Sequence, residues 1–173
     1  MIQNILEVFE TNIFDPCSHV PKQLPNNKGL YMITANNLNI LPKMMRELKY
    51  NYMLGRPIIY VGISNKSLRA RDYRNHFKGS ARGSTLRKSL GSLMHLTKLR
   101  EKQCPSKYKF VRSDEDKLSQ WMKNNLFLHY LVFEAPDEVE KTLINEINPP
   151  LNLKNNNNKI NIEFRRALKE LRK

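Results

Sequence analysis

The sequence is short of acidic residues, of cysteine and of long apolar runs, and each shortage excludes a class of protein. Its two cysteines, Cys17 and Cys104, lie far apart and outside any Cys-x-x-Cys pair. Neither a disulfide framework nor a zinc site is therefore indicated, and a reducing, cytoplasmic setting is expected. No apolar run approaches membrane-spanning length, and residues 1–4 lack the basic start of a secretion signal.

The scarcity of acidic residues leaves a large positive charge. Thirty Lys and Arg stand against sixteen Asp and Glu, which gives a net charge of +14 and a pI of about 9.9. Between Lys66 and Arg112, fourteen cations face only Asp72 and Glu101. Solubility needs only a modest net charge, so this concentration favours a polyanionic partner over a merely solvated surface. DNA is the expected partner; charge does not exclude RNA, although no RRM-type aromatic signature is present.

A chain of 173 residues with 40% hydrophobic content can bury one modest core, so a single domain, 1–173, is expected. Apolar and β-favouring runs bounded by turn residues predict strands, of which the first two should pair. Caps, helical spacing and proline breaks predict helices. The predicted strands are 29–34, 58–63 and 126–133, and the predicted helices are 42–52, about 65–77, one starting at Ser84, 116–123, 137–148 and 161–172.

Side-chain alternation assigns faces to the second strand. Ile59, Val61 and Ile63 should share one face, and Ile58, Tyr60 and Gly62 the other. Gly62, which has no side chain, should leave space beside Tyr60.

Glu140 stands out in the helix 137–148. At 100° per residue it lies within the arc of Val139, Leu143 and Ile147, so it should face the interior. A carboxylate there is costly unless it is paired, protonated or bound to a metal. Glu140 is therefore either a structural salt-bridge partner or a functional group.

Five short motifs in a fixed order extend over residues 29–152. The chain resembles the GIY-YIG nuclease superfamily in Gly29-Leu30-Tyr31, Tyr60-Val61-Gly62, Leu68-x-x-Arg71 with His76 downstream, Glu140-x-x-Leu143-Ile144 and Pro149-Pro150-Leu151-Asn152. The resemblance implies an α+β fold, with a central three-stranded antiparallel sheet flanked by helices. Segments at about 41–54 and 82–123 would then be helical inserts, followed by a C-terminal helix at 161–172.

The resemblance also implies a metal and a phosphate clamp. Phosphodiester hydrolysis needs an activated water, neutralisation of charge on the phosphate and help for the departing oxygen. Glu140 would bind one divalent cation, Mg²⁺ or Mn²⁺, since a lone carboxylate with waters and phosphate suffices for Mg²⁺. Arg71 would hold a non-bridging phosphate oxygen.

The remaining family positions are polar residues around that centre. By resemblance Tyr31 is the general base, Tyr60 and His76 orient water or phosphate, and Asn152 braces the site. A phenol has a free pKa near 10, so Tyr31 would need nearby positive charge in this role. Taken singly, each of these residues would be an ordinary structural one.

Two spacings depart from the family pattern. Arg69 competes with Arg71, and helical phase does not separate them; the spacing of Arg71 from Leu68 favours Arg71. His76 follows Arg71 by five residues, where four is common in the family.

The segment 82–88 forms a predicted helix start with hydroxyls and flanking cations, a pattern suited to phosphate binding. A plain capped helix would give the same pattern. The nucleic-acid-binding residues predicted here and along the preceding helix are Lys66, Arg69, Arg74, Lys78, Arg82, Ser84, Thr85, Arg87 and Lys88.

The function implied by the resemblance is a metal-dependent endonuclease that cuts DNA. A nucleic-acid-binding module without catalysis, and an RNA-directed nuclease, are the alternatives. One such site cuts one strand at a time, so a double-strand break would require a homodimer or two successive events.

Overall fold

The computed structural model describes residues 2–173, with the side chains of residues 72, 105 and 106 left aside. Three strands, β2 (Gly29–Ala35), β4 (Arg56–Ser64) and β7 (Leu126–Val132), form the centre of an antiparallel sheet. They confirm the three predicted strands and the pairing of the first two. The sheet has five strands rather than three, in the order β1-β7-β2-β4-β3, because the two-residue strands β1 (Ile13–Phe14) and β3 (Tyr52–Met53) extend its edges.

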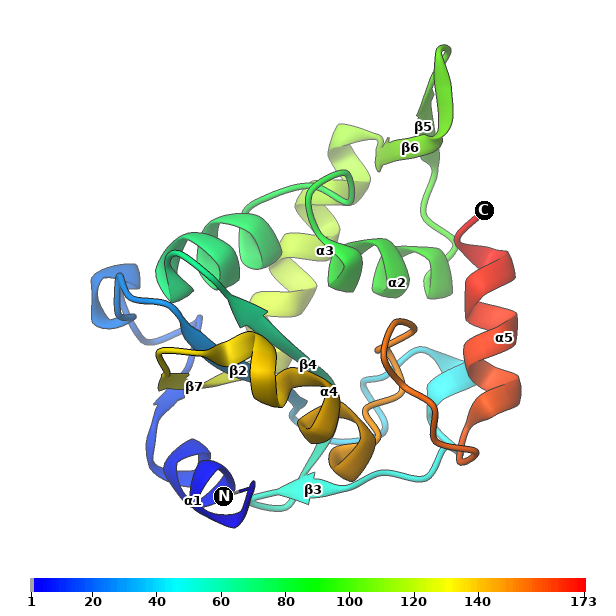
Figure 1. Ribbon diagram of the computed structural model, residues 1–173. Helices are drawn as coiled ribbons and strands as arrows, with labels where there is room; N and C mark the ends of the chain where they lie inside the picture. Colours follow the sequence, from blue (N-terminus) through cyan, green and yellow to red (C-terminus); the bar gives the residue numbers. More distant parts are fainter. Residues whose placement is uncertain (1) are drawn as a thin grey trace.

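Helices cover both faces of this sheet (Figure 1). On one face lie α1 (Ile2–Thr11) and α4 (Pro136–Ile147), whose apolar residues pack with Leu30, Met32 and Val61. The other, larger core is built by the π-helix η3 (Arg69–Phe77) with α2 (Thr85–Leu93), α3 (Arg112–Asn125) and α5 (Ile162–Leu171). The sheet therefore separates two apolar clusters.

A β-bulge in β4 changes the predicted alternation. Ile33 pairs with Tyr60 and Thr34 with Ile58, so Ile59 is an extra residue in the ladder. Ile59 and Tyr60 consequently belong to the same core, and Ile58 joins Val61 in the other. The bulge presents the Ile59 carbonyl to the loop after α4, where the Leu151 N–H donates to it at 3.1 Å.

The predicted helix 42–52 is wrong. The segment contains a single 3-10 turn, η2 (Lys43–Met45), followed by turns and β3. Side chains take the carbonyls that a helix would use: Arg46 Nε donates to the Leu41 carbonyl at 2.9 Å, and the Tyr50 hydroxyl to the Met45 carbonyl at 2.6 Å. Such local bonds compete with helix formation.

The insert 82–123 is only partly helical. Between α2 and α3 lies a hairpin of β5 (Lys98–Glu101) and β6 (Cys104–Phe110), which projects from the body of the molecule (Figure 1). Its buried Tyr108 and Phe110 alternate with exposed Lys107 and Lys109, the period of a half-buried strand. A short 3-10 turn, η1 (Pro21–Gln23), completes the elements, and none of the helices described is long and apolar enough to cross a membrane.

Candidate active site

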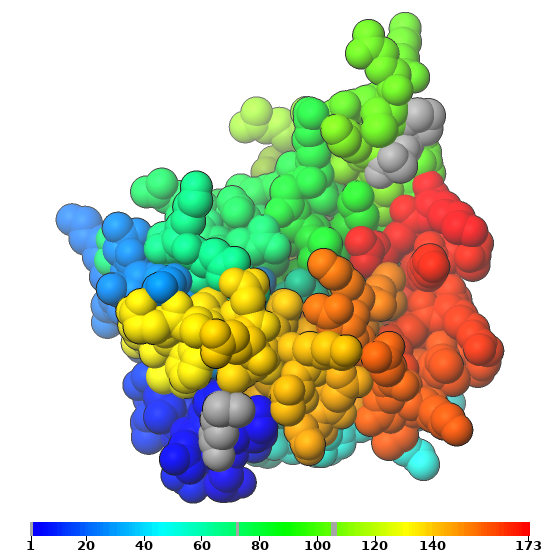
Figure 2. Space-filling view, in the orientation of Figure 1, coloured from blue at the N-terminus to red at the C-terminus, as the bar shows by residue number. Residues whose placement is uncertain are grey.

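A pocket of about 910 Å³ lies where α2, α4, α5 and the loop after α4 meet. That loop lies between α4 and α5 on the face shown in Figure 2. Tyr60, Arg71, Glu140 and Asn152 all line the pocket. Four of the six predicted catalytic residues, which come from a strand, two helices and a loop far apart in the sequence, therefore share one cavity.

Glu140 lies at the edge of the core-facing side of α4 and is half-buried. Burial raises the pKa of its carboxyl, and the charge of Asp137 adds to this; Lys154, Asn155 and Arg71 act in the opposite direction, Lys154 most strongly. Asn155 Nδ2 lies 3.5 Å from Oε2. Among the ion pairs within 4 Å in the described part of the chain, none involves Glu140, so the salt-bridge alternative has no partner there.

Tyr31, His76 and Ser84 form a buried chain of hydrogen bonds. The Tyr31 hydroxyl lies 2.7 Å from His76 Nε2, and His76 Nδ1 lies 2.6 Å from Ser84 Oγ. Burial lowers the His76 pKa to about 3, with the charges of Arg71 and Arg87 adding to the effect. The imidazole is therefore neutral, with one ring nitrogen donating and the other accepting.

Tyr60 reaches the pocket, whereas the Tyr31 side chain is fully buried. The Tyr60 hydroxyl lies 2.9 Å from Thr85 Oγ1 on the first turn of α2. The two tyrosine rings lie with centroids 6.2 Å apart. A water in the pocket thus meets Tyr60 first, and Tyr31 lies behind it.

Gly62 makes room for Tyr31 rather than for Tyr60, the residue that alternation predicts. It pairs directly with Tyr31, and a Cβ at Gly62 would lie 2.4 Å from the Tyr31 hydroxyl oxygen. The glycine is required by the close approach of this phenol.

Asn152 holds the loop after α4 against β4. Val61 N–H donates to Asn152 Oδ1 at 2.9 Å, and Asn152 Nδ2 donates to the Val61 carbonyl at 2.8 Å. The amide thus pairs with both backbone groups as a neighbouring strand would. This fixes the pocket floor beside Tyr60.

The structure separates the two competing arginines. Arg69 donates from Nε to the Leu24 carbonyl and from an Nη to the Lys22 carbonyl, each at 2.9 Å. Arg71 lines the pocket and acts on the charge of Glu140. Arg71 is therefore the arginine at the site, and Arg69 ties η3 to the preceding loop.

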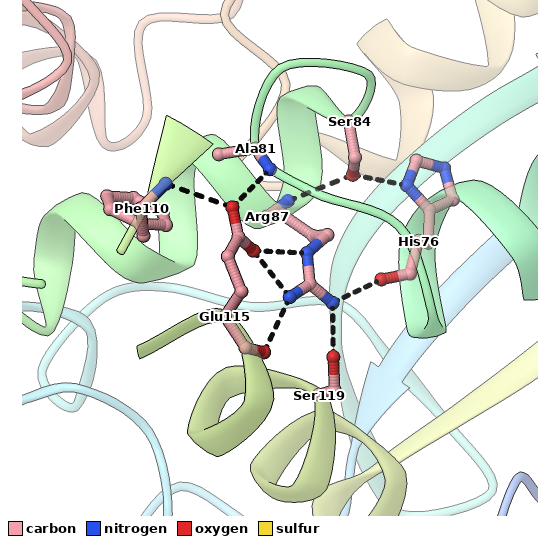
Figure 3. Close-up of polar contacts among 7 residues, drawn as sticks. All are labelled: His76, Ala81, Ser84, Arg87, Phe110, Glu115 and Ser119. Carbon is pink, nitrogen blue, oxygen red and sulfur yellow. Dashed lines mark hydrogen bonds and ion pairs between the residues drawn. The ribbon is translucent and has the colours of Figure 1, made fainter. Parts of the chain in front are cut away.

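Arg87 corrects one predicted nucleic-acid contact. Its side chain is fully buried and donates to Glu115 Oε2 from Nε at 3.0 Å and from Nη2 at 2.6 Å (Figure 3). It also donates to the His76 carbonyl at 3.0 Å and to Ser119 Oγ at 2.9 Å. With all these partners in the interior, Arg87 is not available to a phosphate. The sequence shows that Arg87 follows a helix cap, but it does not show that Arg87 forms a buried ion pair with Glu115, 28 residues away.

Ser84 is likewise buried, and its role is to cap α2: its hydroxyl accepts from the Arg87 N–H at 3.1 Å. Among the other predicted nucleic-acid residues, Thr85 and Lys88 line the pocket. Exposed cations outside it are Lys66, Arg74, Lys78 and Arg82, the last paired with Glu101 at 2.7 Å.

Several cations that line the pocket are absent from the residues predicted by sequence. They come from β5, the loop after α4 and the end of α5, and are Arg100, Lys154, Lys169, Arg172 and Lys173. Their signal in the sequence is weak, because most are separated from one another by polar or apolar residues. With Arg71 and Lys88 they give the pocket seven cations against one carboxylate.

The pocket is strongly cationic and also holds one carboxylate and a tyrosine. Such a site suits a phosphate-bearing substrate. A family model described as the GIY-YIG catalytic domain matches residues 29–173, so the chain belongs to this family. Membership supports a nuclease-type function and a nucleic-acid substrate in general terms. Comparisons with curated proteins and with solved structures gave no match.

Proposed function

We propose that the chain is an endonuclease that hydrolyses phosphodiester bonds in DNA with one divalent cation, Mg²⁺ or Mn²⁺. The observation that carries the proposal is the meeting of Glu140, Arg71 and Tyr60 in one cationic pocket. Family membership is independent support for a nuclease.

The residues at Glu140 fit a hard cation that keeps much of its water. Among the described residues there is no cluster of three or more His, Cys, Asp or Glu, which a closed zinc site would need. One half-buried carboxylate in the lining of this pocket suits Mg²⁺, which commonly takes one or two carboxylates with waters and phosphate oxygens. Bound there, the cation would neutralise charge on the scissile phosphate and the leaving oxygen.

Arg71 is proposed to hold a non-bridging phosphate oxygen from the side of η3. A guanidinium suits this task because it stays charged and donates in a fork. Asn152 keeps the pocket floor in place through Val61. These are binding and positioning roles, and they require no proton transfer.

Tyr31 is proposed as the general base, with His76 as its partner. A neutral His76 can accept a hydrogen bond from the Tyr31 hydroxyl at Nε2 while donating from Nδ1 to Ser84, so it orients the phenol without taking its proton. Because Tyr31 is buried and Tyr60 lines the pocket, Tyr60 is proposed to orient the water. Tyr31→Phe and Tyr60→Phe compared in one assay test this division: retained cleavage in Tyr31→Phe would move the base role to Tyr60.

The experiment is nicking of supercoiled plasmid in Mg²⁺ or EDTA. Wild type should nick in Mg²⁺ alone, and Glu140→Gln should be slower by about a hundredfold or more, as for removal of a group that stabilises charge in the transition state. Glu138→Gln is the matched control, since Glu138 is exposed on the same helix and does not line the pocket. Equal rates for wild type and Glu140→Gln would refute the proposal, and binding without nicking would indicate the non-catalytic module. A labelled RNA substrate in parallel distinguishes the RNA-directed alternative.

A further inference from the structure

Four cations from three elements gather around the buried ring of Tyr108. Lys88 Nζ from α2 lies 4.6 Å from the ring centroid, Lys98 Nζ from β5 lies 5.0 Å away, and the Arg100 guanidinium carbon lies 5.5 Å away. Arg172, at the end of α5, is close enough for Tyr108 to influence its pKa. We call Lys88, Lys98, Arg100 and Arg172 the Tyr108 cluster.

The Tyr108 cluster adjoins the proposed active site. Lys88, Arg100 and Arg172 line the same pocket as Glu140 and Arg71. Thr85, which contacts the Tyr60 hydroxyl, lies one turn before Lys88 on the same face of α2. Tyr60 also acts on the pKa of Arg172, so Arg172 lies near both Tyr60 and Tyr108.

Three members of the cluster, Lys88, Lys98 and Arg172, crowd like charges together without an acidic side chain paired to them among the described residues. Burial lowers the pKa of Lys98, and the charges of Arg100 and Lys88 lower it further; burial and then Arg172 do the same for Lys88. Among the ion pairs found between described side chains, none includes Lys88, Lys98 or Arg172. The Tyr108 ring offsets part of the repulsion through its electron-rich face, but it carries no charge. A bound anion would remove the rest.

We propose that the Tyr108 cluster binds a second phosphate of the nucleic-acid substrate, apart from the phosphate at Glu140 and Arg71. The substrate class rests on the proposed function. Lys88, Arg100 and Arg172, which line the pocket, match the several oxygens of a phosphodiester, and Lys98 adds its charge beside them. Such a contact fixes the position of the strand without reading its sequence, so the cluster acts as a positioning site.

A structural role for part of the cluster is visible and has to be separated from binding. Lys98 Nζ donates to the Leu171 carbonyl at 2.5 Å and so ties the hairpin to the end of α5. Arg100 is exposed, and Arg172 is partly buried. The test therefore leaves Lys98 in place and uses Arg100→Gln together with Arg172→Met, which keeps much of the apolar stem of the partly buried side chain. Arg100→Gln alone is the second variant, because an exposed substitution leaves folding intact.

The experiment is titration of a short fluorescein-labelled DNA duplex by fluorescence anisotropy, in EDTA and at several salt concentrations. Arg112→Gln with Lys117→Gln is the matched control, since it removes the same charge from exposed positions on α3 that do not line the pocket. The cluster variant should raise Kd by roughly tenfold or more, as for removal of a charged hydrogen bond. The slope of log Kd against log salt should fall by about 0.9 for each phosphate that the variant no longer binds.

Binding in EDTA is measured without cleavage, so the second phosphate site and the nuclease activity are tested independently. If the cluster variant and Arg100→Gln bind with the Kd and salt slope of the α3 control, the second phosphate site is refuted, whatever the plasmid assay gives. If binding weakens as expected but wild type never nicks plasmid, the cluster stands and the nuclease proposal falls. A thermal melt of each variant shows that the proteins compared are folded.

Discussion

Gly62 and Tyr31 lie directly opposite each other on neighbouring strands, so close that a single added carbon at Gly62 would lie 2.4 Å from the Tyr31 hydroxyl oxygen. The phenol is held between this glycine and His76, whose Nε2 lies 2.7 Å from the same oxygen. The position of the Tyr31 hydroxyl is therefore set by a missing side chain on one side and by a hydrogen bond on the other.

Gly62→Ala should displace Tyr31 and weaken both stability and nicking. Overpacking of a close-packed core costs about 1–3 kcal/mol, and the displaced hydroxyl would move out of hydrogen-bonding range of His76. Urea denaturation measures the first effect and plasmid nicking the second. Gly83→Ala is the control, since a Cβ there meets no atom within 4 Å. A Gly62→Ala protein as stable and as active as Gly83→Ala would contradict the packing argument.

Asn152→Asp should damage the site more than Asn152→Ala does. Alanine leaves the Val61 N–H and carbonyl unpaired, at a cost of about 1–3 kcal/mol. Aspartate still accepts from the N–H, but it faces the Val61 carbonyl with oxygen in place of a donor and adds a buried charge. The free energy of unfolding of the two variants gives the order. If Asn152→Asp matched wild type, the paired contact with Val61 would not be what holds this loop.

The centre of the fold was predictable because its strands carry local signals. Residues 29–35 and 126–132 are rich in branched and aromatic side chains, and prolines bound the helix α4. The edge strands β1 and β3 are two residues each, too short for any period to show. The hairpin was missed because its alternation is hidden among cations, although Tyr108 and Phe110 display it.

The site could be predicted for residues whose position follows from helical phase or motif order. It could not be predicted for side chains whose position depends on a partner distant in the sequence. Glu140 was assigned to the inner side of its helix from phase, and it is half-buried in the pocket. Phase could not choose between Arg69 and Arg71, because the Leu24 and Lys22 carbonyls that hold Arg69 lie more than forty residues away. The cations of α5 enter the pocket through a tertiary contact that no local pattern records.

Acid should destabilise the protein from about pH 6.5 downward. Burial lowers the pKa of His76 to about 3 and that of His129 to about 4, against a value near 6.5 in the unfolded chain. Below about pH 6.5 the unfolded state therefore binds more protons than the folded state. The contribution of these two histidines to the free energy of unfolding is therefore fully present above that pH, and it is lost as the pH falls toward 4 and then 3.

Urea denaturation between about pH 7 and pH 5 measures this loss, to which each buried histidine adds up to about 1.4 kcal/mol per pH unit. His129→Gln should reduce the slope of the unfolding free energy against pH, even if it lowers the stability itself. His95→Gln, the same substitution at an exposed position, is the control. The same slope in all three proteins would show that carboxylates, not histidines, govern the acid response.

Arg87→Met should unfold the protein more readily than any exposed charge substitution. It leaves the Glu115 carboxylate buried without its cation, and breaking a buried ion pair in this way costs about 3–5 kcal/mol. Arg82→Gln, which breaks the exposed pair with Glu101, is the matched control and should cost at most about 1 kcal/mol. Urea denaturation compares the two.

The same Arg87→Met variant tests whether Arg87 binds DNA or only stabilises the fold. Since the Arg87 guanidinium contacts Glu115, Ser119 and the His76 carbonyl inside the protein, DNA affinity measured well below the melting temperature should stay within about twofold of wild type. Its salt slope should be unchanged, because the number of phosphates bound stays the same. A stable Arg87→Met protein with a reduced salt slope would show the opposite: that Arg87 leaves Glu115 for the nucleic acid when the substrate binds.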